Sequence, residues 1–273
     1  MGFKVIPLSH FATVVFYFNV HYWPLYYFQY TFNSMNLCIL FVSSYLCFGL
    51  YKLIDMKNNE LRIAQQTYNI AAVEQEEREL MKLRGKFLSY FSVEKLHSLT
   101  IEEYVVGLQN TESFCYWLER TLHRLGSISG QPSYKFGVWY SPTKREYCFE
   151  QRFGDNYKEA FQALKTSLIN LIEDGEKEDY ASISKNPINS SIKGKILAVY
   201  FPEKYMNVYA KKHLDYYLTA LGLNTSELKR LDVIYKRVAL LNFKNEDEEM
   251  KHWSNYTFSK FLWSHYPKDP RRS

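Results

Sequence analysis

One long uncharged run near the amino terminus limits what this part of the chain can fold into. The 47 residues from Val5 to Tyr51 contain no Asp, Glu, Lys or Arg and are rich in Phe, Tyr, Trp, Leu and Val. A stretch of this kind is a buried core, a membrane span or a cleaved signal, and its length separates these alternatives. The run therefore decides whether the remaining residues work in solution or beside a bilayer.

Two segments of this run are predicted to be membrane helices. Residues 37–54 carry one charge, Lys52, and a helix of this length reaches roughly 27 Å at about 1.5 Å per residue, close to the thickness of the hydrocarbon layer. Residues 11–32 are more polar and contain Pro24 and several tyrosines, so this segment either crosses the bilayer or lies along its surface. We expect one transmembrane helix or a helical hairpin within residues 1–55.

The charges that flank the run predict its orientation. Lys52 lies near the end of the second segment, and Lys57 and Arg62 follow it, before the first acidic cluster. This bias places the long carboxy-terminal part in the cytoplasm and the protein at the cell membrane. A signal peptide fits poorly, because Lys4 is the only basic residue before the run and no small-residue cleavage pair follows it. Met56 is an alternative start, since the polar stretch after it would begin a soluble, cytoplasmic protein.

The composition of residues 56–273 sets wide bounds on function. They hold 32 Lys and Arg against 28 Asp and Glu, a net charge of about +4, which permits contact with nucleic acid or anionic lipid but requires neither. Cys115 and Cys148 form no closely spaced pair and are expected to be reduced thiols of a cytoplasmic domain.

The hydrophobic pattern predicts an α+β fold that is predominantly helical and has a small β-hairpin. Residues 56–91 are expected to form a stalk helix whose polar middle faces water, and residues 92–273 a cytoplasmic domain. The hairpin strands are predicted at 134–140 and 146–151, and a further strand at 195–201. Thr100 and Glu103 have the spacing of a capping box. Further helices are expected from Thr111 to Leu125 and at 155–172, 208–221, 226–243 and 250–266.

No motif with strong catalytic meaning is present. Gly194-Lys195 is followed by Ile196, so the phosphate-binding loop of nucleotide hydrolases is missing. The triplet from Glu249 to Lys251 has the Glu-x-Lys form of a metal-dependent nuclease, but it is expected by chance in a chain rich in both residues. The seven histidines have no metal-binding spacing. We therefore predict no catalytic residue, no metal site and no cofactor.

Aromatic and basic residues interleave in the predicted hairpin. Aromatic rings stack on unpaired bases while cations meet phosphates, so this mixture suits a nucleic-acid-binding surface. The candidate nucleic-acid-binding residues are Lys135, Trp139, Lys144, Arg145 and Arg152. Strand alternation places Lys135 and Trp139 on the face opposite Phe136. In the alternative interpretation the aromatic residues are core and the cations form its solvated rim.

A second group of cations is predicted to be a solvated surface rather than a binding groove. Its members are Lys193, Lys195, Lys204, Lys211 and Lys212.

Three segments carry a family resemblance. They are FCYWLERTLHRLGSISGQPSYKFGVWY, KGKILAVYFPEKYMNVYAKKHLDYYLTALGL and HWSNYTFSKFLW, in this order. Over approximately residues 86–263 the chain resembles the region that precedes the AAA+ motor in McrB-like, modification-dependent restriction ATPases of bacteria. The resemblance implies a module that senses DNA, often at modified bases, while motor and nuclease lie elsewhere. The chain departs from the family pattern because the motor is absent and the uncharged run precedes the similar region.

The leading functional hypothesis is therefore a membrane-tethered, non-enzymatic sensor or nucleic-acid-binding module of a bacterial antiviral or restriction-like system. Its expected partners are nucleic acid, the lipid bilayer and a separately encoded motor or nuclease. An alternative is a membrane effector that perturbs the bilayer after its cytoplasmic domain binds a partner or signal. A third hypothesis is a metal-dependent nuclease that uses Glu249 and Lys251.

Overall fold

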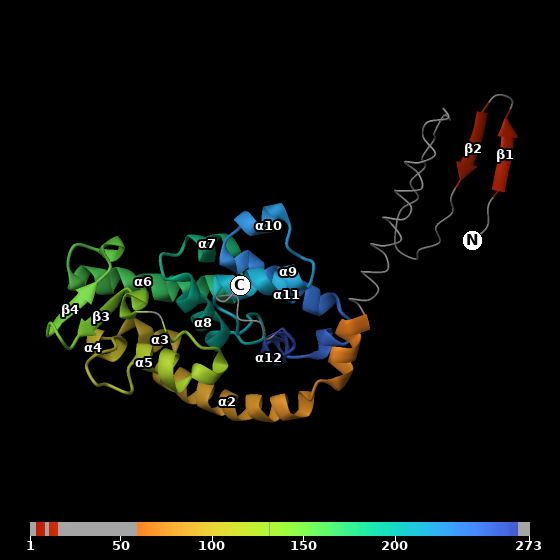
Figure 1. Ribbon diagram of the computed structural model, residues 1–273. Helices are drawn as coiled ribbons and strands as arrows, with labels where there is room; N and C mark the ends of the chain where they lie inside the picture. Colours follow the sequence, from red (N-terminus) through yellow and green to blue (C-terminus); the bar gives the residue numbers. More distant parts are fainter. Residues whose placement is uncertain (1–3, 9–10, 16–58, 131, 267–273) are drawn as a thin grey trace. The chain divides into compact units, whose positions relative to one another are not determined.

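The computed structural model describes residues 4–8, 11–15, 59–130 and 132–266 (Figure 1). The chain divides into two units, residues 1–64 and 65–273, and each is considered by itself. In the first unit, strands β1 (Lys4–Leu8) and β2 (Phe11–Val15) pair antiparallel. Residues 59–64 of this unit are helical.

The helix predicted for residues 11–32 is wrong at its start, because the first five of these residues form β2. Three of the five are Thr or Val, whose branched side chains favour strands. The rest of that segment and residues 37–54 lie outside the described residues. Within the described ranges, no helix has both the length and the apolar character needed to cross a membrane.

The helix predicted across residues 56–91 is interrupted. Helical backbone ends at Thr67, and α2 (Ile70–Tyr90) begins after Asn69, whose side chain caps it by accepting a hydrogen bond from the Ala72 amide. The ring of Tyr68, at the break, lies 5.2 Å from that of Phe261 and 5.7 Å from that of Trp253. The break therefore lies where a local cap at Asn69 and the aromatic contacts of Tyr68 coincide.

Helix α2 belongs to the second unit and packs against its core on one side. Its side chains Leu80 and Phe87 are buried, and Phe87 contacts the rings of several other core aromatics. In its polar middle, Glu76 forms ion pairs with Arg124 at 2.9 Å and with Lys260 at 3.2 Å. The polar middle faces water at residues 74, 75, 78 and 79, as predicted, while Glu76 binds cations from distant parts of the sequence.

Helix α8 (Ser190–Tyr200) lies at the centre of the second unit, between α6 and α2 in Figure 1. Every residue from Ser191 to Tyr200 is buried. The strand predicted at 195–201 is therefore wrong. An apolar run of this length has the same appearance in a buried strand and in a fully surrounded helix, and the Asn189 side chain starts the helix by accepting a hydrogen bond from the Ser191 amide.

The remaining helices surround α8. Thr100 and Glu103 form the predicted capping box of α4, and Thr225 caps α10 as its position suggests. The helix predicted from Thr111 begins later, at Phe114, and continues as a π-helical turn. These helices are α3 (Val93–His97), α4 (Ile101–Tyr104), α5 (Phe114–Tyr116), α6 (Tyr157–Glu176), α7 (Tyr180–Lys185), α9 (Lys211–Ala220), α10 (Ser226–Arg230), α11 (Val233–Glu246) and α12 (Asn255–His265).

The predicted hairpin is present in a shorter form. Strands β3 (Val138–Ser141) and β4 (Glu146–Phe149) pair antiparallel, with Trp139 opposite Cys148. Residues Ser133–Phe136 form a 3-10 turn instead of the first part of the strand. The prediction of a predominantly helical fold with a small antiparallel sheet is confirmed in this part of the chain.

The tight contact between α8 and α11 gives a test of this packing. A methyl group at Gly194 would lie 2.5 Å from the Arg237 guanidinium carbon, so Gly194→Ala is expected to destabilise the domain by about 1–3 kcal/mol. The matched control is Gly85→Ala in α2, where the added carbon meets nothing within 4 Å and the change is expected to stabilise by about 0.5–1 kcal/mol. Thermal unfolding of both variants measures the difference, and equal stability would contradict the packing.

Candidate functional site

Buried cations are the main chemical peculiarity of the described domain. Six Lys and Arg side chains are buried there, and none of the described Asp and Glu residues is. A buried charge is costly unless hydrogen bonds or an opposite charge compensate it, so each needs a structural or functional reason. The six are Lys135, Lys193, Lys195, Lys236, Arg237 and Lys244.

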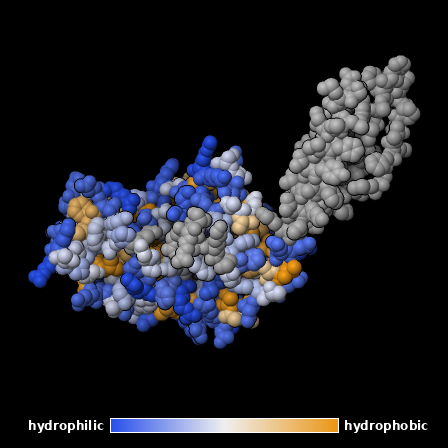
Figure 2. Space-filling model, in the orientation of Figure 1, coloured by the Kyte–Doolittle hydropathy of each residue, from blue (hydrophilic) through white to orange (hydrophobic). Residues whose placement is uncertain are grey.

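Burial of these cations changes the net charge of the side chains that are accessible to solvent. Residues 59–266 contain 28 Lys and Arg and 27 Asp and Glu. Because six of the cations are buried, 22 basic residues remain against 27 acidic ones. Hydrophilic residues dominate the face drawn in Figure 2. Among the charged residues of 59–266 that are not buried, acidic ones outnumber basic ones. The basic excess in the sequence therefore does not predict an electropositive surface.

Lys193, Lys195 and Arg237 bind backbone carbonyl groups. The Lys195 ammonium donates to Leu122 O at 2.6 Å and Gly126 O at 2.7 Å. The guanidinium of Arg237 donates to three carbonyls, of Ser190, Val208 and Tyr209, and Lys193 likewise to three, of Ile183, Ser184 and Asn186. Burial lowers the pKa of Lys195 well below its ordinary value and that of Arg237 to about 10.

These contacts correct the second predicted surface patch. Lys193 and Lys195 are not solvated, because they fasten α8 to neighbouring loops from inside. Lys211 and Lys212 are exposed as predicted, at the start of α9. Lys204 is partly buried and donates to Glu176 O at 2.5 Å.

Lys135 does not lie with the other predicted nucleic-acid-binding residues. Its side chain is 1% exposed, and its ammonium binds the Glu119 carboxylate and Ile128 O. Because Ser133–Phe136 is a 3-10 turn, strand alternation does not apply and the side chain enters the core. An ammonium held in this way is not available to neutralise a phosphate.

Trp139, Lys144 and Arg145 lie on one hairpin. Lys144 and Arg145 are exposed in its turn, where Arg145 adopts a φ of 58°, and Lys144 lies 3.7 Å from the Glu146 carboxylate. Trp139 is partly exposed and is the second residue of β3. Arg152 is exposed in the 3-10 turn Gln151–Phe153, beyond the end of β4 that is remote from the hairpin turn.

The two faces of the hairpin have different roles. The register places Val138 and Tyr140 on one face with their partners Phe149 and Tyr147, all packed against the core. Tyr147 also stacks on Tyr157 with ring centroids 5.0 Å apart. Burial, with the bond from its hydroxyl to Glu102, raises the pKa of Tyr147 to about 12.

Trp139 lies on the other face, where pairing places Cys148 next to it and Glu146 nearer the turn. Most of the hairpin aromatics therefore pack against the core, as the alternative interpretation expects. Trp139 lies on the opposite face and is partly exposed. The three side chains Trp139, Lys144 and Arg145 together are called the hairpin tip below.

The triplet proposed for nuclease chemistry lies in a 3-10 turn after α11. Lys251 donates to the Glu248 carboxylate at 2.5 Å, and Glu249 is exposed. In the ranges that the structure describes, no group of three or more His, Cys, Asp and Glu is placed to hold a metal ion.

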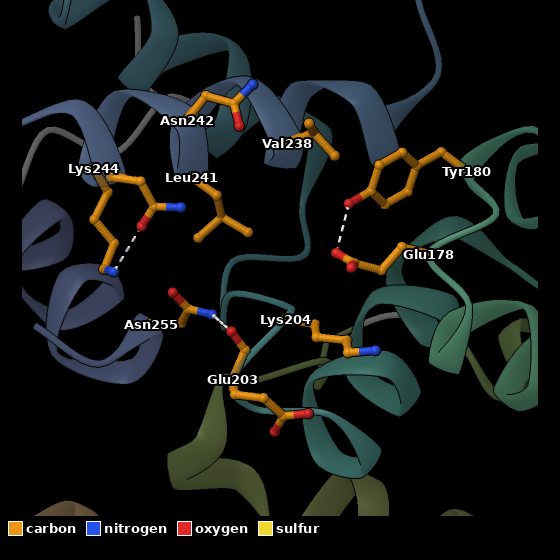
Figure 3. A pocket seen from close by; sticks show the side chains of 10 residues that line it. Glu178, Tyr180, Glu203, Lys204, Val238, Leu241, Asn242, Lys244 and Asn255 are labelled. Carbon is orange, nitrogen blue, oxygen red and sulfur yellow. Dashed lines mark hydrogen bonds between the residues drawn. The ribbon is translucent and has the colours of Figure 1, made fainter. Parts of the chain in front are cut away.

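Sequence reasoning missed a polar cavity of about 280 Å³ between α7, α11 and the start of α12 (Figure 3). Its lining residues come from segments that are far apart in the sequence, and each of them alone has the composition of an ordinary polar surface. No local sequence pattern therefore predicts the cavity. It is lined by Glu178, Tyr180, Glu203, Lys204, Val238, Leu241, Asn242, Lys244, Asn245 and Asn255.

Comparisons of the chain with protein-family models, with curated proteins and with solved structures find no match. The resemblance to the McrB-like region therefore stays a prediction.

The role assigned to Lys195 can be measured. Lys195→Met keeps the length of the side chain but leaves Gly126 O without this donor, while Leu122 O keeps its bond from the Leu125 amide. We therefore expect a loss of about 1–3 kcal/mol of stability, the cost of one unsatisfied group. Lys82→Met, at an exposed position of α2, is the control and should be close to neutral. Chemical unfolding of the two variants compares them. Equal stabilities would show that the ammonium does not hold these loops.

Proposed function

We propose that the chain is a membrane-tethered, non-enzymatic sensor whose cytoplasmic domain contacts nucleic acid through the hairpin tip. The observation that carries the proposal is the exposure of Lys144 and Arg145 in the turn of the hairpin that holds the partly exposed Trp139. A ring on the same hairpin as two cations can stack on a base while the cations meet nearby phosphates. The proposed setting is a bacterial antiviral or restriction-like system with a separately encoded motor or nuclease.

The charge balance limits how such contact works. Because the accessible Lys and Arg of residues 59–266 are outnumbered by Asp and Glu, long-range attraction to a polyanion is weak. Binding then depends on the hairpin tip itself and favours a strand whose bases are unstacked. Two phosphate contacts correspond to a slope of about −1.4 in a plot of log affinity against log salt for a single strand.

The first test concerns the hairpin tip. The double variant Lys144→Gln/Arg145→Gln is expected to lose salt-dependent binding to single-stranded oligonucleotides, because both phosphate contacts are removed. Lys211→Gln/Lys212→Gln changes the net charge equally at another exposed pair and should bind as the wild type does. Fluorescence anisotropy at several salt concentrations measures both affinity and slope. Binding that survives in the first variant, or that is absent in the wild type, contradicts the proposal.

The second test concerns the tether. The full chain is expected to stay in the membrane fraction after an alkaline carbonate wash, because an uncharged helix in the bilayer is not held by ionic contacts. A chain that begins at Met56 should appear in the soluble fraction. Release of the full chain by carbonate would argue against a span in residues 1–55.

The uncharged run also motivates the alternative proposal of a membrane effector. In that case residues 1–55 disturb the bilayer after the domain binds its signal, and overexpression should impair growth only when these residues are present. Equal growth with and without residues 1–55 would count against an effector and leave the sensor.

A further inference from the structure

Lys244 differs from the other buried cations in its hydrogen bonds. Lys135, Lys193, Lys195, Lys236 and Arg237 each donate to at least two acceptors. The Lys244 ammonium donates to one, Asn245 Oδ1, at 3.1 Å, and forms no ion pair with any residue that the structure describes. The Lys244 residue is 5% exposed.

An ammonium group has three N–H donors, so two of those of Lys244 have no described protein acceptor. A buried charge in this condition is expensive, and burial lowers the pKa of Lys244 accordingly. Because Lys244 lines a polar cavity, these two N–H groups are available to an acceptor from outside the chain.

The position of Lys244 indicates where such an acceptor binds. It lies on the wall of the polar cavity, on the opposite side from Glu178 and Tyr180 (Figure 3). Asn242 and Asn245 of α11 and Asn255 at the start of α12 add amide groups to the same wall. The other five buried cations do not line the cavity. Lys244, which has a single described acceptor, is therefore also the buried cation that lines it.

Opposite Lys244, the cavity offers acceptors. The Glu178 carboxylate receives a hydrogen bond from the Tyr180 hydroxyl at 2.8 Å. Glu203 also lines the cavity, with its carboxylate turned away from Lys244 in Figure 3. Glu178 adopts a φ of 56°, an uncommon backbone conformation for a residue other than glycine. Leu241 and Val238 supply a small apolar surface between the charged sides.

We propose that this cavity binds a small polar metabolite that carries a carboxylate or phosphate group. The oxyanion of the ligand accepts hydrogen bonds from Lys244, and its hydroxyl or amino groups donate to Glu178. A cavity of about 280 Å³ is close to the smallest volumes typical of ligand sites, so it suits a molecule of the size of an amino acid or a sugar phosphate. This site is independent of the hairpin tip and would give the sensor a second, soluble signal.

The first experiment asks whether the protein alone satisfies Lys244. The full chain in a neutral detergent is unfolded by heat, without added ligand, as Lys244→Met and as Lys195→Met. We expect Lys244→Met to unfold at the wild-type temperature or above it, and Lys195→Met to unfold well below it. A loss in Lys244→Met as large as that in Lys195→Met would show that the ammonium already has its partners, and would overturn the proposal.

The second experiment adds probes at constant ionic strength, with sodium chloride as reference. Sodium phosphate, sodium glutamate and ribose 5-phosphate are titrated into the wild type, Lys244→Met and the exposed-site control Lys185→Met. At least one probe is expected to raise the unfolding temperature of the wild type and the control in a saturable way, and to leave Lys244→Met unchanged.

The pattern identifies the anionic group. A response to glutamate alone supports a carboxylate ligand, and a response to either phosphate compound alone supports a phosphate ligand. No shift with any probe, or the same shift in Lys244→Met, overturns the proposal. The variant Lys144→Gln/Arg145→Gln should keep the wild-type response, so failure here is distinguishable from failure of the hairpin tip.

Discussion

The hydrogen bonds of the buried Arg237 guanidinium are the constraint on which the second unit depends. They reach carbonyls at the start of α8 and in the segment before α9, so one side chain of α11 connects three parts of the chain. This arrangement requires Gly194, because any β-carbon there meets the guanidinium. On the other side, Arg84 of α2 donates to Val199 O at 2.5 Å and Tyr200 O at 2.8 Å. The carbonyl groups at the end of α8 thus receive their donors from α2.

This use of cations has a cost and a consequence. Each buried ammonium or guanidinium must be surrounded by acceptors, and backbone carbonyls supply most of them here. The consequence is an acidic balance among the charges left accessible in residues 59–266. The proposed nucleic-acid contact then depends on the hairpin tip, Trp139, Lys144 and Arg145. Lys244 stands apart, because it has one described protein acceptor and lines the polar cavity.

Parts of the fold and of the proposed contact surface follow from local sequence. The capping box at Thr100 and Glu103 and the hairpin depend on near neighbours in the chain, and the structure confirms the first and shows the second in a shorter form. The exposure of Lys144 and Arg145 follows equally from their place in a tight turn. The polar cavity lay beyond sequence reasoning, because Glu178 and Lys244 are brought to one space only by the packing of α7 near α11.

By itself, the sequence determined that residues 5–51 lack charge, that the rest is mainly helical, and where several helices begin. These properties depend on residue type and on neighbours a few positions away. Tertiary structure decided that α8 is a helix, since an apolar run surrounded on all sides shows no periodicity. It also decided that Lys135, Lys193 and Lys195 are buried, because only folding brings Glu119 and the carbonyl groups of distant loops within reach of their ammonium groups. From sequence alone a lysine is predicted to be exposed, because the partners that allow its burial lie far along the chain.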